Sequence, residues 1–308
     1  IGNLGCLSTG ATIVYPGPSF DPLDCLTAVQ EERCTSLYGV PTMFIAQLEH
    51  PRFAQFDLSS LRTGIMAGAP CPVEVMRRVT SEMHARELCI AYGMTETSPA
   101  STLTRPGDGV ERRCGTVGRV LPHVEVKVVD PETGLVVPSG RAGEICTRGY
   151  LVMRGYYRDP DSTARAVDEA GWMHTGDLGV MDSDGYLNIV GRIKDMVLRG
   201  GENIYPREIE ELLYRHPAIS EAQVIGVPDA RMGEELMAWV TLREGASLSE
   251  DQVRDYCRER LAHFKVPRYV KFTSEFPMTV TGKIQKYRMR ELAIQELGLQ
   301  EAASIRTA

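Results

Sequence analysis

The stretch from residue 171 to residue 206, GWMHTGDLGVMDSDGYLNIVGRIKDMVLRGGENIYP, constrains the fold more than any other part of the sequence. Two β-prone runs, Leu178–Met181 and Tyr186–Val190, flank the linker DSDG, and an Asp- and Gly-rich linker of this kind predicts a hairpin. The hairpin would bring Asp177 and Arg192 toward the same end of the ladder. A carboxylate accepts hydrogen bonds from two hydroxyls and a guanidinium donates them, so this pair suits a polyol such as ribose.

Length, charge and cysteine spacing narrow the class of protein. A chain of 308 residues predicts about two domains, and a net charge of −7 argues against a nucleic-acid-binding protein. No apolar run approaches the roughly 20 residues that span a bilayer, so no transmembrane segment is expected. None of the eight cysteines has C-x-x-C spacing, which favours buried or inert thiols over a zinc site.

Helical and strand signals alternate over residues 1–100. Helices are predicted at Asp21–Leu37, Pro41–Leu48 and Pro72–Met83, and strands at Gly64–Ala67 and Leu88–Tyr92. The alternation predicts a parallel sheet with covering helices. Ligands bind beyond the carboxyl ends of the strands in such sheets, so the residues that follow these two strands are candidates for a site.

The tripeptide Gly68-Ala69-Pro70 follows the first of these strands, and YGMTET, residues 92–97, follows the second. A tyrosine ring can stack on a purine, a threonine hydroxyl can bond a phosphate oxygen, and a glutamate can hold Mg²⁺. Taken alone, however, these residues favour a plainer interpretation. The tripeptide is then a turn, and YGMTET is a strand followed by a capped turn, with Tyr92 in the core.

Residues 103–193 have a different pattern. Leu103–Gly118 is loop-like, short β runs follow at Val124–Val129, Leu135–Val137 and Glu144–Arg148, and a short helix is predicted at Asp161–Val167. Turn residues separate the β runs, which predicts a small antiparallel unit. His174 is expected to pack or to form a surface hydrogen bond, because nothing nearby in the sequence orients it as a base.

The residues after Arg192 predict a small α+β domain of about 110 residues. Strands are expected at Met196–Arg199, Ala222–Val227, Leu236–Leu242 and Tyr269–Thr273, and helices from Pro206, at Ser249–Leu261 and at Tyr287–Leu297. Gly200–Ile204 is expected to be a loop. Its adjacent glycines, Gly200 and Gly201, allow positive φ and the close approach of a ligand, or simply a tight turn. The tail Gln300–Ala308 is expected to fray.

Lys283 stands in a glycine-containing turn, TGKI, between the last predicted strand and helix. A single lysine in such a turn is usually solvated, and by itself it carries little functional weight. The nearby cations Lys286, Arg288 and Arg290 are expected to form a solvated basic face.

Four motifs in a fixed order resemble the adenylate-forming superfamily, which contains acyl-CoA synthetases, adenylation domains and firefly luciferase. They are AYGMTETSP at 91–99, GEICTRGYLVMRGYYRDPD at 143–161, the stretch 171–206, and TGKI at 281–284. Together they span most of the chain, so the resemblance is specific. Within the superfamily, the residues of these motifs most resemble those of a medium-chain acyl-CoA synthetase.

The resemblance implies an α/β fold with two domains. Residues 1–193 would be the C-terminal part of a large AMP-binding domain, with a small antiparallel β-barrel at about 103–193. Residues 194–308 would be a small mobile α+β lid domain that pivots at Lys194. The superfamily's phosphate loop, rich in Ser, Thr and Gly and closed by Pro-Lys, is not in the sequence. It is expected upstream of Ile1, in a longer protein.

The resemblance also implies roles for the candidate residues. Tyr92 and Gly93 would lie against adenine, whose edge Gly68, Ala69 and Pro70 would line. Thr95 would contact phosphate, Glu96 would hold magnesium, and Asp177 and Arg192 would bind the nucleotide. Lys283 would neutralise charge as the adenylate forms, and the loop with Gly200 and Gly201 would line the path of pantetheine.

The implied activity is an ATP-dependent fatty acid–CoA ligase that uses ATP, Mg²⁺ and coenzyme A. It would form an acyl-adenylate and pyrophosphate, and then acyl-CoA and AMP. A non-catalytic AMP- or ATP-binding relative is an open alternative, and adenylation for another acceptor, such as a carrier domain or a luciferase-like oxygenation, ranks lower. Small molecules are the expected partners. An intracellular location is expected, and a mitochondrial one rests on the resemblance alone.

Overall fold

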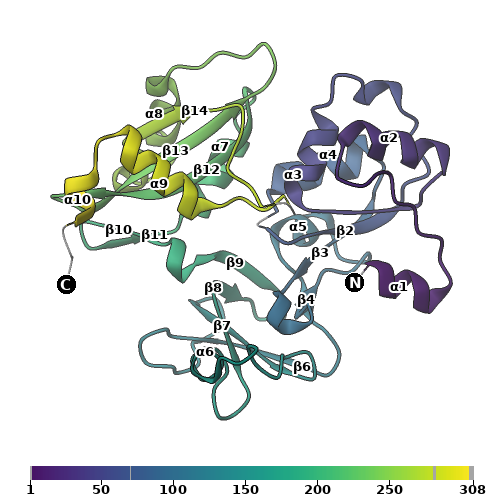
Figure 1. Cartoon of the computed structure of the whole chain (residues 1–308), viewed down its shortest axis with the longest axis horizontal. Helices are drawn as coiled ribbons and strands as arrows, with labels where there is room; N and C mark the ends of the chain where they lie inside the picture. Colours follow the sequence, from purple (N-terminus) through teal and green to yellow (C-terminus); the bar gives the residue numbers. More distant parts are fainter. Residues whose placement is uncertain (1, 70, 280–281, 305–308) are drawn as a thin grey trace. The chain divides into compact units, whose positions relative to one another are not determined.

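The computed structural model describes residues 2–69, 71–279 and 282–304. It divides into two compact units, Ile1–Ile189 and Val190–Ala308, which Figure 1 draws from purple to teal and from teal to yellow. Each unit combines helices with sheets, which confirms the predicted α/β class. The boundary after residue 193 and the pivot at Lys194 stay predictions.

The first unit contains a five-stranded sheet in the order β1-β2-β3-β4-β5. Its strands are β1 (Ser36–Gly39), β2 (Thr63–Ala67), β3 (Glu87–Tyr92), β4 (Thr102–Leu103) and β5 (Arg119–Val120). β1, β2 and β3 are parallel neighbours, whereas β4 and β5 are antiparallel additions. The predicted parallel sheet is therefore confirmed for the strands that precede the candidate site.

Helices connect and pack against these strands. They are α1 (Gly2–Thr9), α2 (Pro22–Glu31), α3 (Pro41–Leu48), α4 (Val73–Glu82) and α5 (Val110–Gly115). The Asp21 carboxylate caps α2 by accepting the N–H groups of Leu23 and Asp24. The predicted continuation of this helix to Leu37 is wrong. Arg33 has a φ of 49°, which ends a right-handed helix, and the following residues pair with β2 instead.

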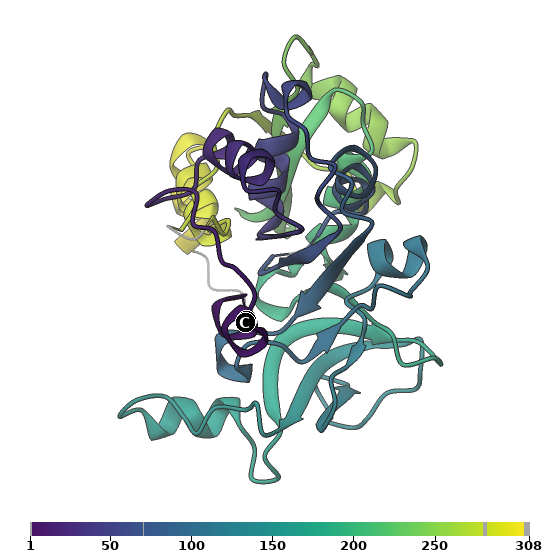
Figure 2. The same cartoon turned by 90° about the vertical axis from the view of Figure 1, so that its right-hand side faces the viewer.

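A second sheet runs β6-β7-β8-β9 and belongs to the first unit except for the last three residues of β9. Its strands are β6 (Val124–Val129), β7 (Ala142–Gly149), β8 (Met173–Met181) and β9 (Leu187–Arg192), and α6 (Pro160–Ala166) lies between β7 and β8 in the chain. The linker DSDG joins β8 to β9, where the Asp182 N–H donates to the carbonyl of Tyr186 (2.9 Å), so the predicted hairpin is confirmed. Figure 2 shows these strands, in teal, bending through the lower part of the view.

Three expectations for residues 103–193 need correction. The described strands place β6 and β9 at opposite edges of the sheet, so no closed barrel is shown. Leu135–Val137 is not a strand, because Val136 makes only an isolated bridge to Val129 and is 66% exposed. The loop-like segment Leu103–Gly118 contains α5, whose Arg113 is buried and donates to the carbonyl of Leu88.

The second unit is a sheet with helices on both faces. The sheet runs β11-β10-β13-β12, and β14 pairs with β13. Its elements are β10 (Val197–Arg199), β11 (Glu202–Ile204), α7 (Pro206–Tyr214), β12 (Ile219–Asp229), β13 (Gly233–Leu242), α8 (Glu250–Arg258), β14 (Tyr269–Phe272), α9 (Lys286–Glu296) and α10 (Gln300–Ser304). The helix predicted from Ser249 is confirmed as α8, and a capping box between Ser249 and Gln252 begins it.

Strand β13 divides its apolar side chains between two cores. Leu236, Ala238 and Val240 pack with residues of α7 and α8. Met237 and Trp239 pack on the other side with Met289 and Ala293 of α9. Successive side chains of a strand point to opposite faces, so a continuous apolar run predicts a strand that is covered on both.

Three details of the second unit differ from expectation. Part of the predicted loop Gly200–Ile204 is β11, which pairs with β10. The tail forms α10 up to Ser304, and α10 contacts β12 and α9. Lys286 and Arg290 do not form a solvated face, because Lys286 Nζ donates to the buried Glu210 (2.5 Å) and Arg290 donates to the carbonyl of Gly226 (2.7 Å).

No helix in residues 2–69, 71–279 or 282–304 is long and apolar enough to cross a membrane. The cysteines are free, and most are buried. Burial raises the pKa of the Cys257 thiol to about 11, which keeps it protonated and supports the expectation of inert thiols.

Glu221 on β12 makes the stability of the second unit depend on pH. Its side chain is 8% exposed, and its Oε1 has no hydrogen-bond partner among the described residues. Burial, together with the negative charge of Glu210, raises the pKa of Glu221 to about 7. The folded state therefore retains a proton that the unfolded state loses near pH 4.5, so stability falls as the pH rises from about 4.5 to 7.

We expect Glu221→Gln to remove this dependence. The variant should gain up to roughly 3 kcal/mol over the native chain at pH 8, since each pKa unit is worth about 1.4 kcal/mol, and little at pH 4.5. Urea unfolding followed by tryptophan fluorescence across this pH range measures the difference. The exposed Glu244→Gln is the control, and equal pH slopes in both variants would contradict the assignment.

Candidate functional site

Two neighbouring strands of the parallel sheet end at the candidate residues. β2 and β3 pair in register at Ala67 and Ala91. Gly68, with a φ of 90°, and Ala69 follow β2, and the segment that begins with Gly93 follows β3. Pro70, predicted to line the adenine edge, lies outside the described residues. The structure thus brings these two segments to one edge of the sheet, where ligands bind in open α/β sheets.

The hydroxyl of Tyr92 donates to Asp177 Oδ2 (2.9 Å). Tyr92 is the last residue of β3 and Asp177 lies in β8, so this bond joins the two sheets of the first unit. Both residues are buried, at 9% and 7% exposure. The sequence suggested Tyr92 as a stacking ring and Asp177 as an acceptor for hydroxyls. It carried no signal for their mutual contact, because they are far apart in the chain.

Glu96 lies in a short 3₁₀ turn, η2 (Thr95–Thr97). Its Oε1 accepts a hydrogen bond from the hydroxyl of Tyr156 (2.9 Å), and its backbone carbonyl accepts the N–H of Met153 (2.8 Å). The hydrogen bond to Glu96 raises the pKa of Tyr156. Thr95 is exposed beside it. Tyr156 belongs to the motif at 143–161, but the sequence assigned it no role.

Gly93 permits a close backbone approach. A Cβ at this position would lie 2.1 Å from the carbonyl oxygen of Pro99, and the described backbone of Ala100 is also within contact distance. A glycine is required here because backbone atoms cannot move away as a flexible side chain can. The chain therefore folds back directly after β3, so that Pro99 lies against Gly93, and this turn positions Thr95 and Glu96.

We expect Gly93→Ala to displace the Pro99 backbone and to destabilise the first unit by about 1–3 kcal/mol, the usual effect of overpacking. Thermal unfolding measures the loss. Gly107→Ala is the matched control, because a Cβ there would meet none of the described atoms within 4 Å. A Gly93→Ala variant as stable as Gly107→Ala would show that the turn can relax.

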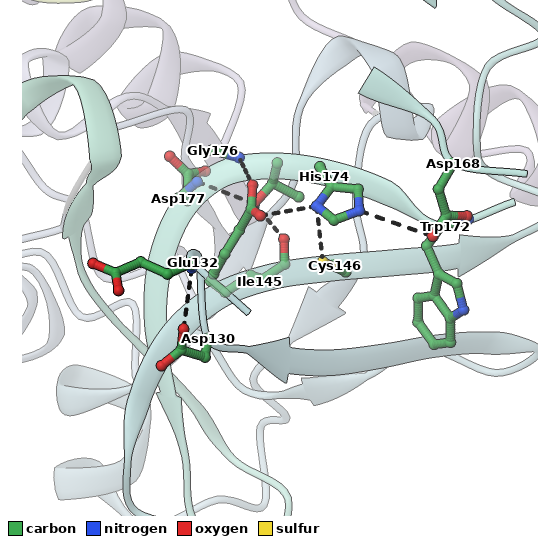
Figure 3. A network of polar contacts seen from close by, with 11 residues as sticks. Asp130, Glu132, Ile145, Cys146, Asp168, Trp172, His174, Gly176 and Asp177 are labelled. Atoms are coloured by element: carbon green, nitrogen blue, oxygen red, sulfur yellow. Dashed lines mark hydrogen bonds and ion pairs between the residues drawn. The ribbon is translucent and has the colours of Figure 1, made fainter. Parts of the chain in front are cut away.

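The polar network around β7 and β8 gives His174 a partner. His174 Nδ1 lies 2.8 Å from Glu144 Oε2, and its Nε2 lies 3.9 Å from Asp168 Oδ2. Figure 3 shows His174 between Cys146 and Asp168, with Gly176 and Asp177 further along the same strand. His174 is thus a hydrogen-bonding residue, as expected, and the sequence did not identify Glu144 as its partner.

The remaining predicted residues lie in the second unit. Arg192 ends β9, and Lys194 lies in the 3₁₀ turn η3 (Ile193–Asp195); both are exposed. Because Asp177 belongs to the first unit and Arg192 to the second, their joint action on a ribose stays a prediction.

Gly200 and Gly201 form the tight turn between β10 and β11, with φ values of 60° and 91°. The N–H of Gly200 donates to the carbonyl of Met232 (2.8 Å), and a Cβ at Gly200 would lie 2.6 Å from Met232 Cε. Met232 therefore holds the turn at Gly200, while Gly201 remains exposed.

Lys283 is exposed on another tight turn. Its backbone N–H donates to Thr279 Oγ1 (3.1 Å), and the N–H of Thr279 donates to the carbonyl of Lys283 (2.9 Å). Gly282 has a φ of 76°. The turn anchors the backbone and leaves the long side chain in solvent, although Thr281 lies outside the described residues.

Comparison with known proteins identifies the family. Residues 1–157 match the family described as AMP-binding enzyme, and residues 208–283 match the AMP-binding enzyme C-terminal domain. The chain belongs to the AMP-binding enzyme family. The resemblance drawn from the four motifs is thereby confirmed, and a medium-chain acyl-CoA ligase is among the relatives, as expected.

Two curated relatives match this member of the AMP-binding family over nearly its whole length. A putative acyl-CoA synthetase, YngI, of Bacillus subtilis is 55% identical over 98% of the chain and 55% of its own length. The mitochondrial medium-chain acyl-CoA ligase ACSF2 of Danio rerio is 48% identical over 94% of the chain and 48% of its own length. The chain thus spans about half the length of these relatives.

Solved structures show the same fold. The anthranilate CoA ligase AuaEII, in complex with anthranoyl-AMP, is 31% identical with a TM-score of 0.85, and the match covers 94% of this chain and 55% of that one. ATP-bound MatB from Rhodopseudomonas palustris is 36% identical with a TM-score of 0.83, covering 94% and 56%.

Proposed function

We propose that this chain carries the nucleotide-binding and lid parts of an ATP-dependent acid–thiol ligase. The reaction forms an acyl-adenylate and pyrophosphate, after which the thiol of coenzyme A attacks the acyl carbon and AMP leaves. The observation that carries the proposal is the buried bond between Tyr92 and Asp177 at the end of β3, in a chain of the AMP-binding family. The two acyl-CoA ligase relatives support the same chemistry.

In this proposal the first unit binds the nucleotide. Asp177 Oδ2 accepts the Tyr92 hydroxyl, and a carboxylate can accept several hydrogen bonds, so Asp177 is assigned to the ribose hydroxyls. The ring of Tyr92 and the backbone after Gly68 lie at the same edge of the sheet and suit adenine. Thr95, exposed on its turn, suits a phosphate oxygen. Arg192 would donate to the sugar from the second unit.

Glu96 fits a magnesium ion. Mg²⁺ prefers carboxylate oxygens, and a carboxylate that accepts the Tyr156 hydroxyl at Oε1 retains Oε2 as a ligand atom. When bound, Mg²⁺ offsets charge on the phosphates of ATP. Tyr156 would orient Glu96 for this purpose.

The second unit would serve the two half-reactions in turn. Neither half-reaction needs a protein nucleophile, so positioning and electrostatics do the work. Lys283, a flexible point charge on an anchored turn, would neutralise the carboxylate and α-phosphate oxygens during adenylation. The turn at Gly200 and Gly201 would line the pantetheine path in the second step. The pivot between the two arrangements is assigned to Lys194.

A fatty acid is the proposed acyl substrate, on the basis of the medium-chain acyl-CoA ligase relatives. The structural neighbours named for anthranilate and benzoate act on other acids, so the acyl pocket rather than the nucleotide site decides the substrate. The vertebrate relatives are named as mitochondrial and the Bacillus relative is bacterial. A mitochondrial location is therefore proposed only for a chain of eukaryotic source.

The test of the proposed function is pyrophosphate release from Mg-ATP on addition of octanoate, followed by octanoyl-CoA formation on addition of coenzyme A. We expect activity when the chain is joined to an upstream segment that carries a phosphate loop, because no such loop stands in the sequence. AMP binding without pyrophosphate release in that longer form would favour the alternative, a non-catalytic nucleotide-binding protein.

We expect Lys283→Ala to lower adenylation by about 10²-fold or more, because it removes a charge that stabilises the transition state. Thioester formation from supplied acyl-adenylate should remain. Both half-reactions are measured separately in the active form, and Arg288→Ala, which removes another exposed cation nearby, is the control. An equal loss of rate in both half-reactions would show that Lys283 does not act specifically in adenylation.

A further inference from the structure

Strand β8 carries a bulge opposite β7. Cys146 of β7 pairs with His174, and Glu144 pairs with Leu178. Between these pairs β7 has the single residue Ile145, whereas β8 has Thr175, Gly176 and Asp177. Extra residues in one strand of a pair leave the ladder and re-aim their side chains, and such bulges are common beside active sites.

Backbone conformation and two side chains hold the bulge in place. Gly176 has a φ of 69°, a conformation that favours glycine. Thr175 Oγ1 donates to the carbonyl of Ile145 (2.7 Å) and accepts the N–H of Asp177 (3.2 Å). The N–H of Gly176 donates to Glu144 Oε1 (3.1 Å). The bulge residues are not paired in the ladder between β7 and β8, and these hydrogen bonds hold them in place instead.

Glu144 is the residue that joins this bulge to His174. Its side chain is 12% exposed, and its second oxygen, Oε2, accepts from His174 Nδ1 (2.8 Å). Bonds to an ionised acceptor are stronger than neutral ones, and more so where water is excluded. The Glu144 carboxylate thus accepts hydrogen bonds from two residues of β8: His174, which pairs with β7, and Gly176, which lies in the bulge.

We propose that Glu144 is a positioning residue for the nucleotide site: through the Gly176 N–H and His174 it fixes the bulge that presents Asp177. The inference rests on the proposed role of Asp177 in binding AMP. Asp177 is held from two directions, by the bulge on β8 and by the Tyr92 hydroxyl. Glu144 acts on the ligand only through Asp177 and does not itself contact it.

A bound metal is the competing explanation for the same residues. Glu144, Cys146 and His174 offer ligand atoms within 4.8 Å of one another. However, the acceptor oxygens of Glu144 already take the N–H groups of Gly176 and His174. Cys146 Sγ also lies 3.5 Å from His174 Nδ1, so it belongs to the same hydrogen-bonded network. The observations favour the hydrogen-bonded network.

The experiment measures AMP binding to the chain by calorimetry. In Glu144→Gln one acceptor oxygen becomes an NH₂ group, so either Gly176 or His174 faces a donor instead of an acceptor. We expect AMP to bind about tenfold more weakly, the loss of one charge-assisted hydrogen bond. Glu125→Gln on the neighbouring strand β6 is the matched control, because the exposed Glu125 pairs with Arg148 away from the bulge. It should bind AMP as the native chain does.

A double-variant cycle separates positioning from a general loss of stability. In an Asp177→Asn background, Glu144→Gln should weaken AMP binding no further, because its effect passes through the Asp177 carboxylate. Additive losses would overturn the inference. If Glu144→Gln does not fold, Thr175→Val replaces it, since it removes the hydroxyl that accepts the Asp177 N–H and keeps the shape of the side chain.

The outcomes distinguish the inference from the proposed function. A native chain that binds no AMP would overturn the nucleotide assignment and the role of Glu144 with it. If the native chain binds AMP and Glu144→Gln binds it with the same affinity, the inference about Glu144 is wrong and the proposed function is unaffected. AMP affinity that is lost after chelation and restored by Zn²⁺ would replace the hydrogen-bonded network with a metal site.

Discussion

The buried bond between the Tyr92 hydroxyl and Asp177 is the interaction on which the first unit's site depends. One partner ends a strand of the parallel sheet, and the other lies on the bulge of an antiparallel strand. Burying a carboxylate is costly unless it is hydrogen-bonded, so the bond from Tyr92 helps to offset the cost of placing Asp177 there. The site is therefore built where two sheets of different architecture meet.

The second unit is stabilised in another way. Its sheet is covered on both faces by helices, and charged residues enter its core in pairs. Glu210 is 6% exposed and accepts both the N–H of Val224 (2.8 Å) and the ammonium of Lys286 (2.5 Å). Glu221 is also buried, but no cation pairs with it among the described residues. Its burial is the main cause of its raised pKa. The same core thus contains one buried carboxylate with a cationic partner and one whose pKa is raised by burial.

Much of the fold could be predicted from the sequence because it depends on local signals. Alternating helices and strands identified the parallel sheet, and a helix was correctly predicted to start at Ser249. The failures had tertiary causes. A residue at positive φ ended α2 earlier than its apolar pattern indicated, and Leu135–Val137 lacked a partner strand to complete a ladder. Lys286 and Arg290 were predicted to form a solvated face. They instead pair with Glu210 and Glu234, carboxylates that are distant in the sequence.

The sequence by itself determined the family, the order of the candidate residues and the hairpin that follows Asp177. These follow from residue types and spacings within short segments. Only the tertiary structure decided that Tyr92 bonds to Asp177, that Tyr156 bonds to Glu96, and that Glu144 holds the bulge. Such contacts join residues that are far apart in the chain, and a hydrogen bond depends on distance and direction in space, which folding sets and spacing along the sequence does not.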